Sequence, residues 1–456
     1  MKTERKRMIY TGLVTLIVVF SSTFAILMTL ERTDYRNYLQ SEYSKNMYGL
    51  IDNVENIRVN LGKSAVTGSR EQSIVVFEEI FRNSAMAGDK LHSLPVSEEL
   101  TAETSKFLSQ VGDFCYTLAK SSSEGKELKD EDYKTIETLK QQSFTLESSL
   151  KTVSEDINSG NVKWGEIRKK ASGVFAMGTE ADISDKFKGI QKQVVQYPSL
   201  IYDGPFSDNV LEISPRINSE KQVSESDAEK AARTAIGNER IESIELQPES
   251  GSSRIESYRF IASIKGRTDK NEKITCEISK RGGRVVYLID SKAPMEPTID
   301  VNKAVDIGAR YLSGIGYKNM KSTYTLNYEN TAVISFVYIK DNVTIYPDQI
   351  KLKVSLGDGS ITGIESEKYL IAHYDNRIIP KPQISSNDAK KRVGKKLNIT
   401  SVKLAIVPSE GNKEVLCYEF TGNYNGDNFI VYINAETGYE QKIIQIINTP
   451  NGELTI

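Results

Sequence analysis

Phe429-Ile-Val-Tyr-Ile-Asn-Ala-Glu-Thr-Gly438 is one of three related stretches that decide the fold of this chain. The other two are Ile274-Thr-Cys-Glu-Ile-Ser-Lys-Arg-Gly-Gly283 and Ile350-Lys-Leu-Lys-Val-Ser-Leu-Gly-Asp-Gly359. In each stretch apolar residues occupy alternate positions, a polar residue follows, and a glycine stands four residues after that polar residue. This pattern is typical of a strand with one buried face that ends in a hairpin.

A short helix is predicted upstream of each of these strands, because a capping residue precedes an alanine by four positions. The pairs are Ser224 with Ala228, Asp300 with Ala304, and Ser385 with Ala389. Asp227 and Asp388 supply the acidic third residue of a capping box. The expected helices span 227–236, 300–312 and 387–397. The chain therefore carries three small helix-and-sheet modules in tandem, unlike an enzyme built around one cleft.

The bulk composition excludes several classes of protein. The chain has 456 residues and a net charge of −2, so it is long enough for several domains and lacks the basic surplus of a nucleic-acid-binding protein. Three cysteines, far apart in the sequence, do not form a disulfide framework. Cys276 falls on the apolar side of its strand, which predicts a small core residue, and Cys115 is expected to pack similarly.

An uncharged and mostly apolar run covers residues 8–30, about the length that a membrane-spanning helix needs. Lys2, Arg5, Lys6 and Arg7 precede it, so the positive-inside rule places residues 1–7 in the cytoplasm and the rest outside. A cleavable signal peptide is the alternative. It would have a shorter apolar core, and Thr23-Phe24-Ala25 is a poor cleavage site within the run.

Residues 31–196 have the pattern of an antiparallel helical bundle. Apolar residues at steps of three and four mark four helices, and a further helix or two are expected over 164–196. Members of the expected seam are, in order, Met47, Leu50, Val54, Ile57, Phe77, Phe81, Phe107, Val111, Ile136, Leu146 and Leu150.

The helical half ends in the joint Tyr197-Pro-Ser-Leu-Ile-Tyr-Asp-Gly-Pro-Phe206, where two prolines stop helices and Asp-Gly suits a tight turn. Two interpretations stay open for its aromatic residues. Tyr197, Tyr202 and Phe206 are either exposed anchors for a protein partner or residues that cement the bundle to the first module.

The sequence predicts no catalytic residues, no metal site and no cofactor. His92 and His373 are isolated from any cluster of metal-ligating residues, and neither a serine-hydrolase elbow nor a phosphate-binding glycine loop occurs. Carboxylates are plentiful, so their number does not exclude a two-carboxylate glycosidase, although small tandem modules offer no obvious groove for one.

The helix-strand-hairpin repeat resembles the PepSY module, an extracytoplasmic α+β unit associated with restraining partner enzymes. Glu436-Thr437-Gly438 is nearest to the family's usual ending, whereas Lys280-Arg281-Gly282 departs from it. The order of anchor, helical ectodomain, joint and three modules is similar over the whole chain to the YpeB family of spore germination proteins. The joint is the most specific match.

The resemblance implies a non-enzymatic protein of the forespore or spore inner membrane, with most of the chain facing the cortex. Such a protein localises, stabilises and restrains a SleB-like enzyme that cleaves cortex peptidoglycan, and peptidoglycan itself is a second candidate partner. No nucleic-acid partner is expected. The alternatives are a peptidoglycan hydrolase or glycan-binding enzyme of the cortex, and a general PepSY-type ectodomain that inhibits a protease or hydrolase.

The expected fold is therefore an N-terminal transmembrane helix, an all-α bundle and three α+β modules with a helix packed on an antiparallel sheet. The expected boundaries are 1–7 for a cytoplasmic stub, 8–30 for the anchor, 31–196 for the bundle, 197–223 for the linker, and 224–297, 298–380 and 381–456 for the three modules.

Overall fold

The computed structural model describes residues 2–96, 98–159, 206, 213–248, 254–267, 269, 272–328, 330–409, 413–449 and 452–455. The chain divides into two compact units. The first comprises residues 1–61 and 74–183, and the second comprises residues 62–73 and 184–456. Each unit is described by itself.

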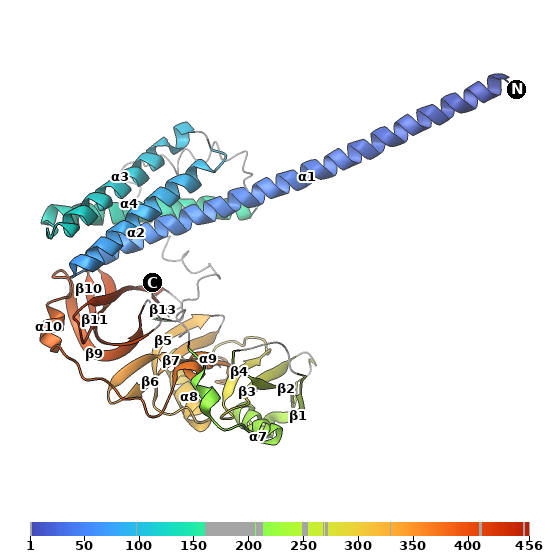
Figure 1. Ribbon diagram of the computed structural model, residues 1–456. Helices are drawn as coiled ribbons and strands as arrows, with labels where there is room; N and C mark the ends of the chain where they lie inside the picture. Colours follow the sequence, from blue (N-terminus) through green and yellow to red (C-terminus); the bar gives the residue numbers. More distant parts are fainter. Residues whose placement is uncertain are drawn as a thin grey trace. The chain divides into compact units, whose positions relative to one another are not determined.

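Helix α1 (Lys2–Ser64) runs without a break from the apolar segment into the helical half (Figure 1). It is the one helix of the described residues that is long and apolar enough to cross a membrane, with a mean hydropathy of 2.4 and no burial in its most apolar window. The sequence predicted a membrane helix and a separate first bundle helix. The two are one element, because no glycine or proline interrupts the turns that join them.

The helical unit also contains α2 (Arg70–His92), α3 (Glu98–Ser123) and α4 (Asp130–Asn158). The four predicted helices are confirmed, and most of their seam residues form the core. Phe81 is an exception, because its side chain is 37% exposed and lies against Tyr116, while Ile80 is buried in its place. The further helix or two expected over 164–196 lie outside the described residues.

One buried ion cluster joins helices of this unit. Glu147 on α4 is paired with Arg58 on α1 at 2.6 Å and with Lys151 at 2.6 Å. Burial opposes the ionisation of Glu147, yet these two cations hold its pKa below the ordinary value.

The sheet-rich unit contains the three predicted modules, and their local details are confirmed. Ser224, Asp300 and Ser385 accept hydrogen bonds from the backbone as helix N-caps. The alternate apolar positions of the three quoted strands are buried. Gly283, Gly359 and Gly438 have φ angles of 61°, 71° and 75°, a left-handed conformation that favours glycine.

The elements follow the same order in each module. The first module has α7 (Glu225–Ile236), the short turn η5 (Asn238–Arg240), β1 (Ile241–Leu246), β2 (Ser257–Ile264), β3 (Lys273–Ser279) and β4 (Val285–Asp290), and the turn η4 (Arg216–Ser219) precedes it. The second has α8 (Val301–Gly314), β5 (Met320–Tyr328), β6 (Thr331–Lys340), β7 (Val343–Ser355), β8 (Ile361–Glu365) and α9 (Glu367–Ala372). The third has α10 (Ser386–Lys390), β9 (Asn398–Pro408), β10 (Glu414–Tyr424), β11 (Asp427–Asn434), β12 (Glu440–Thr449) and β13 (Gly452–Thr455).

The third helix is shorter than predicted. Helix α10 ends at Lys390, whereas the sequence pattern indicated a helix to residue 397. Val66, from the turn between α1 and α2, is fully buried in the apolar core of the third module. The chain after α10 approaches this turn so closely that a Cβ at Gly394 would lie 2.2 Å from the Val66 carbonyl oxygen. A continued helix with side chains would occupy the same space.

The modules are joined into one sheet, which the sequence did not predict. Its order is β1-β2-β3-β4-β8-β7-β6-β5-β13-β12-β11-β10-β9, so β4 of the first module pairs with β8 of the second. A parallel pairing of β7 with β9 closes the strands of the second and third modules into a ring. Helices α7 and α8 pack on one face of the sheet in their modules. The opposite face is open where Arg259 and Glu365 are exposed, whereas on β6 its Ser335 and Val337 are buried.

Candidate functional site: an outward sheet face and a cleft beside it

The outward face of the sheet carries a row of polar and aromatic side chains that crosses the boundary between the first two modules. Arg259, Glu277, Tyr287, Glu365 and Lys351 lie opposite one another on five adjacent strands. The neighbouring register positions are the buried core residues, so pleating directs this row away from the core. We call these five residues the outward row.

The outward row has a positive charge at each end, and a negative charge stands on each side of its central tyrosine. Arg259 is paired with Glu277 at 2.7 Å, and its side chain remains 43% exposed. Burial, followed by the nearby carboxylates of Glu365 and Glu277, raises the pKa of Tyr287, so this phenol keeps its proton at neutral pH. The row thus presents a neutral aromatic ring among charges of both signs.

Two hollows flank the centre of the outward row. Tyr287, Lys351 and Glu365 line both of them, one of about 390 Å³ and one of about 560 Å³. Gly363 lies on the floor of the smaller hollow, where a Cβ would meet the Lys353 side chain at 3.1 Å. The absence of a side chain at this position therefore makes room in the middle of the face.

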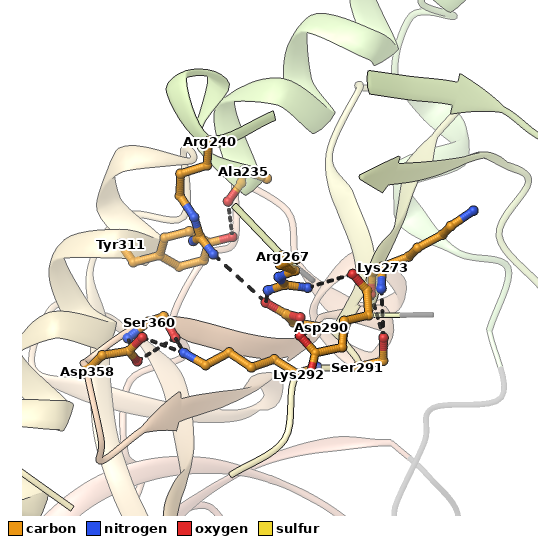
Figure 2. A network of polar contacts seen from close by, with 11 residues as sticks. Ala235, Arg240, Arg267, Lys273, Asp290, Ser291, Lys292, Tyr311, Asp358 and Ser360 are labelled. Carbon is orange, nitrogen blue, oxygen red and sulfur yellow. Dashed lines mark hydrogen bonds and ion pairs between the residues drawn. The ribbon is translucent and has the colours of Figure 1, made fainter. Parts of the chain in front are cut away.

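Behind this face, a polar network fixes the boundary between the first and second modules (Figure 2). Asp290, at the end of β4, has a fully buried carboxylate that accepts a hydrogen bond from Arg267 at 2.6 Å. The neighbouring Lys292 reaches into the second module and pairs with Asp358. Burial opposes the ionisation of Asp358, but hydrogen bonds from Lys292 and Ser360 hold its pKa well below the usual range.

A second contact supports the same boundary between the first and second modules. The Tyr311 hydroxyl on α8 donates to the carbonyl oxygen of Ala235 on α7 at 3.0 Å (Figure 2). Because strand pairing, an ion pair and a helix-to-helix hydrogen bond all join the two modules, they form one continuous surface.

A cleft of about 1070 Å³ lies beside this surface. The turn η4, helix α9, and the backbone turns at Gly282 and Gly316 border it, and Tyr338 of β6 contributes to its floor. We call it the η4–α9 cleft.

An aromatic cluster and a histidine form the floor of the η4–α9 cleft. The His373 ring stacks on Tyr369 at 4.2 Å and meets the edge of Tyr338 at 4.6 Å. Its Nδ1 lies 2.7 Å from the buried carboxylate of Asp348, and its Nε2 lies 3.3 Å from Asp375. Both ring nitrogens therefore have carboxylate partners.

The same aspartate binds a buried arginine. Arg377 donates to Asp348 at 2.7 Å and to the Ala372 carbonyl oxygen at 2.9 Å. Its other terminal nitrogen lies 3.1 Å from Glu414 of the third module, in an ion pair without hydrogen-bond alignment. Burial raises the pKa of Glu414, and Arg377 opposes that shift.

This cluster was not predicted from the sequence. His373 is isolated there, because Asp348 stands 25 residues away on another element. Nothing in the local pattern marks the pair. Strand β7 and the segment after α9 meet only when the second module folds.

The structure describes one of the three predicted partner-binding residues. Tyr197 and Tyr202 lie outside the described residues. Phe206 is only 6% exposed, and its ring packs on Tyr432 at 5.1 Å and Tyr346 at 5.4 Å. Its φ of 64° is unusual for a bulky residue. Phe206 therefore packs on the second and third modules. The sequence-based alternative to a partner anchor was packing between the bundle and the first module.

The cysteines have the positions of core residues. All three cysteines are buried and unbridged, and burial raises the pKa of Cys115 and of Cys417 to about 12. No group of three or more His, Cys, Asp or Glu side chains within the described part of the chain is placed to hold a metal ion.

Comparisons with known proteins match nearly the whole chain. The family model described as YpeB N-terminal matches residues 31–166. That of the YpeB sporulation PepSY1 and PepSY2 domains matches 183–380. The peptidase propeptide and YPEB domain model matches 383–444.

Curated relatives show the same correspondence. Sporulation protein YpeB of Bacillus subtilis is 26% identical over 415 residues, which cover 90% of this chain and 91% of that protein. The Halalkalibacterium halodurans protein of the same name is 25% identical over 408 residues, 89% of each chain. A solved structure, the Bacillus megaterium YpeB C-terminal domain, is 30% identical with a TM-score of 0.46 and covers 50% of this chain and 100% of that one. In agreement with the sequence-based expectation, the chain belongs to the YpeB family of sporulation proteins.

Proposed function

We propose that this protein is a non-enzymatic accessory protein of spore germination that localises, stabilises and restrains a SleB-like cortex-lytic enzyme. The outward row and its two hollows are the surface on which the enzyme docks. Helix α1 anchors the chain in the spore inner membrane, and the modules face the cortex.

The observation that carries this proposal is the continuity of the outward face across two modules. Protein interfaces need a broad and preorganised surface, with aromatic and arginine side chains at the anchor points. Tyr287 stands in the middle of the outward row, and Arg259 and Lys351 stand at its ends. A fixed arrangement of positive and negative charges on such a surface sets the register of a partner and disfavours wrong partners.

The anchoring part of the proposal rests on α1. Its apolar turns are exposed in the described structure and are long enough to span a bilayer. Lys2, Arg5, Lys6 and Arg7 precede them, which favours a cytoplasmic N-terminus and an outside location for the rest.

The geometry of the η4–α9 cleft supports binding over catalysis. A histidine that acts as general base needs a nitrogen free to accept a proton from a nucleophile or water. His373 is paired with Asp348 at Nδ1, and its Nε2 lies 3.3 Å from the exposed carboxylate of Asp375, which is not a nucleophile. The buried cysteines, with their raised pKa values, are poor nucleophiles.

Co-purification from spore membranes tests the proposal. The full chain is expected to retain the lytic enzyme, and a chain that lacks residues 224–456 is expected to lose it. Tyr287→Ala combined with Lys351→Glu should weaken retention, whereas Lys303→Glu, an exposed lysine on α8, should not. Normal enzyme levels in spores with the deleted chain would contradict the proposal.

A second measurement separates the accessory role from the hydrolase alternative. In a zymogram on cortex peptidoglycan, the purified chain alone is expected to leave the substrate intact. A cleared band at the mass of this chain would instead identify it as a peptidoglycan hydrolase.

A further inference from the structure

The geometry points to a second binding site: the η4–α9 cleft binds an anionic saccharide, a sugar chain that carries a carboxylate. This inference goes beyond docking of an enzyme on the outward row and does not depend on it. The cleft's volume of about 1070 Å³ is at the upper end of ordinary ligand sites, enough for more than one sugar unit.

Among the described residues, neither of two guanidinium groups that line the cleft is in an ion pair with a carboxylate, although Glu414 lies close enough to Arg216 to interact with its charge. Arg216 lies over the ring of Tyr374 at 3.9 Å. Arg284 donates to the carbonyl oxygen of Gly316 at 3.1 Å. Neither contact neutralises the positive charge, so both groups remain able to bind a carboxylate in the two-pronged geometry that arginine favours.

The backbone at Gly316 leaves room for the guanidinium group of Arg284. Gly316 has a φ of 96°, and a Cβ at this position would lie 2.3 Å from the Arg284 guanidinium. A side chain there would push Arg284 out of the cleft. Lys318 also lines the cleft and adds a third positive charge.

The floor and walls suit the rest of a sugar. The floor is aromatic and includes Tyr338, Tyr369 and His373, and apolar faces of sugar rings pack on such side chains. The walls supply neutral hydrogen-bonding groups for hydroxyl and amide substituents: Ser214, Asn218, Ser219, Asn319 and Asn376. The lining of the cleft as a whole is more polar than apolar, which suits a ligand rich in hydroxyl groups better than an apolar one.

Two carboxylates also border the cleft. Glu220 lies on the rim, and Asp375 is held near His373. The three cations Arg216, Arg284 and Lys318 outnumber them, so an anionic ligand is favoured over a cationic one.

A peptide is the competing occupant, and the geometry favours it less. Extended peptides commonly bind by adding a strand to a free sheet edge. The only strand residue that lines the η4–α9 cleft is Tyr338, on β6, and both edges of β6 are already paired with β5 and β7. The other lining residues lie in turns, loops and a short helix.

Isothermal titration calorimetry on the full chain in detergent micelles tests the inference. The probes are the disaccharide N-acetylglucosaminyl-N-acetylmuramic acid, the neutral N,N′-diacetylchitobiose, and hexaglutamate. The acidic disaccharide is expected to bind, and the neutral one to bind at least about tenfold more weakly, the loss expected for a charge-assisted hydrogen bond.

Variants locate the binding in the cleft. Arg284→Gln and Arg216→Gln should each lower the affinity for the acidic disaccharide about tenfold or more. Each should also reduce the difference in affinity between the acidic and the neutral disaccharide. The matched control Arg310→Gln changes an exposed arginine on α8, outside the cleft, and should bind like the unchanged chain. Melting temperatures of all variants verify that they fold.

Three results would overturn the inference. The first is that the acidic disaccharide gives no heat of binding at millimolar concentration. The second is that both cleft variants fold and bind it as the unchanged chain does. The third is that hexaglutamate binds more tightly than the disaccharide and loses this binding with Arg284→Gln. The last result would identify a peptide site. Because the sugars are titrated without any enzyme, failure here leaves the proposed docking of the lytic enzyme intact.

Discussion

Phe206 lies inside the strand ring of the second and third modules, and Lys442 is placed over its ring at 4.8 Å. Its backbone carbonyl oxygen accepts a hydrogen bond from Lys368. An aromatic residue with these contacts contributes to the core of the modules. A role as a partner anchor remains a proposal, and it requires the ring to leave this site.

Phe206→Ala separates the two roles. If Phe206 serves packing, the variant should lose about 3–5 kcal/mol of stability, the usual cost of emptying a phenylalanine site. The measurement is the urea midpoint of the full chain in detergent, with Phe81→Ala on the partly exposed site of α2 as the matched control. Equal and small losses in both variants, together with loss of the lytic enzyme, would favour the anchor role.

Glu440 is the second residue whose surroundings matter. Its carboxylate is fully buried and accepts hydrogen bonds from the backbone of Gly68 at 3.1 Å and of Ser69 at 2.8 Å, at the start of α2. Burial raises its pKa from 4.5 to about 7; the hydrogen bonds from Ser69 and Gly68 oppose this shift, and the carboxylate of Glu71 adds to it.

This raised pKa predicts a pH dependence of stability. Between pH 4.5 and 7 the folded chain binds a proton at Glu440 that the unfolded chain has lost, so stability is greatest below this window and falls as the pH rises through it. The full shift corresponds to roughly 3 kcal/mol.

Melting temperatures at pH 5 and pH 7.5 measure the effect. Glu440→Gln, which cannot ionise, should flatten the profile, while Glu436→Gln at the exposed turn of the same hairpin should keep it. A profile that does not change with Glu440→Gln would show that another group is responsible.

At the scale of elements, the third module differs from the other two in how its sheet is covered. Helices α7 and α8 cover their sheets over twelve and fourteen residues, and α10 has only five. Val66, in the turn between α1 and α2, fills part of the space that the missing helical turns would take. Gly68 makes this approach feasible, because a Cβ there would lie 1.9 Å from the Arg392 carbonyl oxygen.

Gly68→Ala is therefore expected to be destabilising, by about 1–3 kcal/mol, as overpacking usually costs. Gly88→Ala is the matched control in the same helix-turn-helix segment, since a Cβ there meets no atom within 4 Å. It should instead stabilise the chain by up to about 1 kcal/mol through better helix propensity. Hydrogen exchange of the backbone amides in residues 62–73 gives the readout. Slower exchange in Gly68→Ala than in Gly88→Ala would contradict this packing.

At the scale of the whole molecule, the continuity of α1 connects a membrane-spanning length of helix directly to the helical unit. A chain that begins at residue 31 should therefore leave the membrane fraction, because the apolar turns that hold it there are gone. Fractionation of spore lysates measures this, and N-terminal sequencing of the full chain distinguishes an anchor from a signal peptide. Cleavage after Ala25 in the mature protein would contradict the anchor.

Local patterns were sufficient to predict the modules. A strand with one buried face has a period of two residues, and a helix cap is decided within four, so Ile350, Leu352, Asp300 and Gly359 could be assigned from neighbours in the sequence. These positions are confirmed. The third helix was the exception, because its length depends on Val66, which is more than three hundred residues away.

The sequence by itself thus determined the four helices of the first unit, the three modules, their caps and turns, and the apolar length of α1. Only the tertiary structure decided the pairing of β4 with β8, which creates the outward row, and the meeting of Asp348 with His373 in the η4–α9 cleft. The physical reason is range. Hydrophobic periodicity and capping act between residues a few positions apart, whereas strand edges and buried ion pairs join groups whose separation along the chain leaves no local signal.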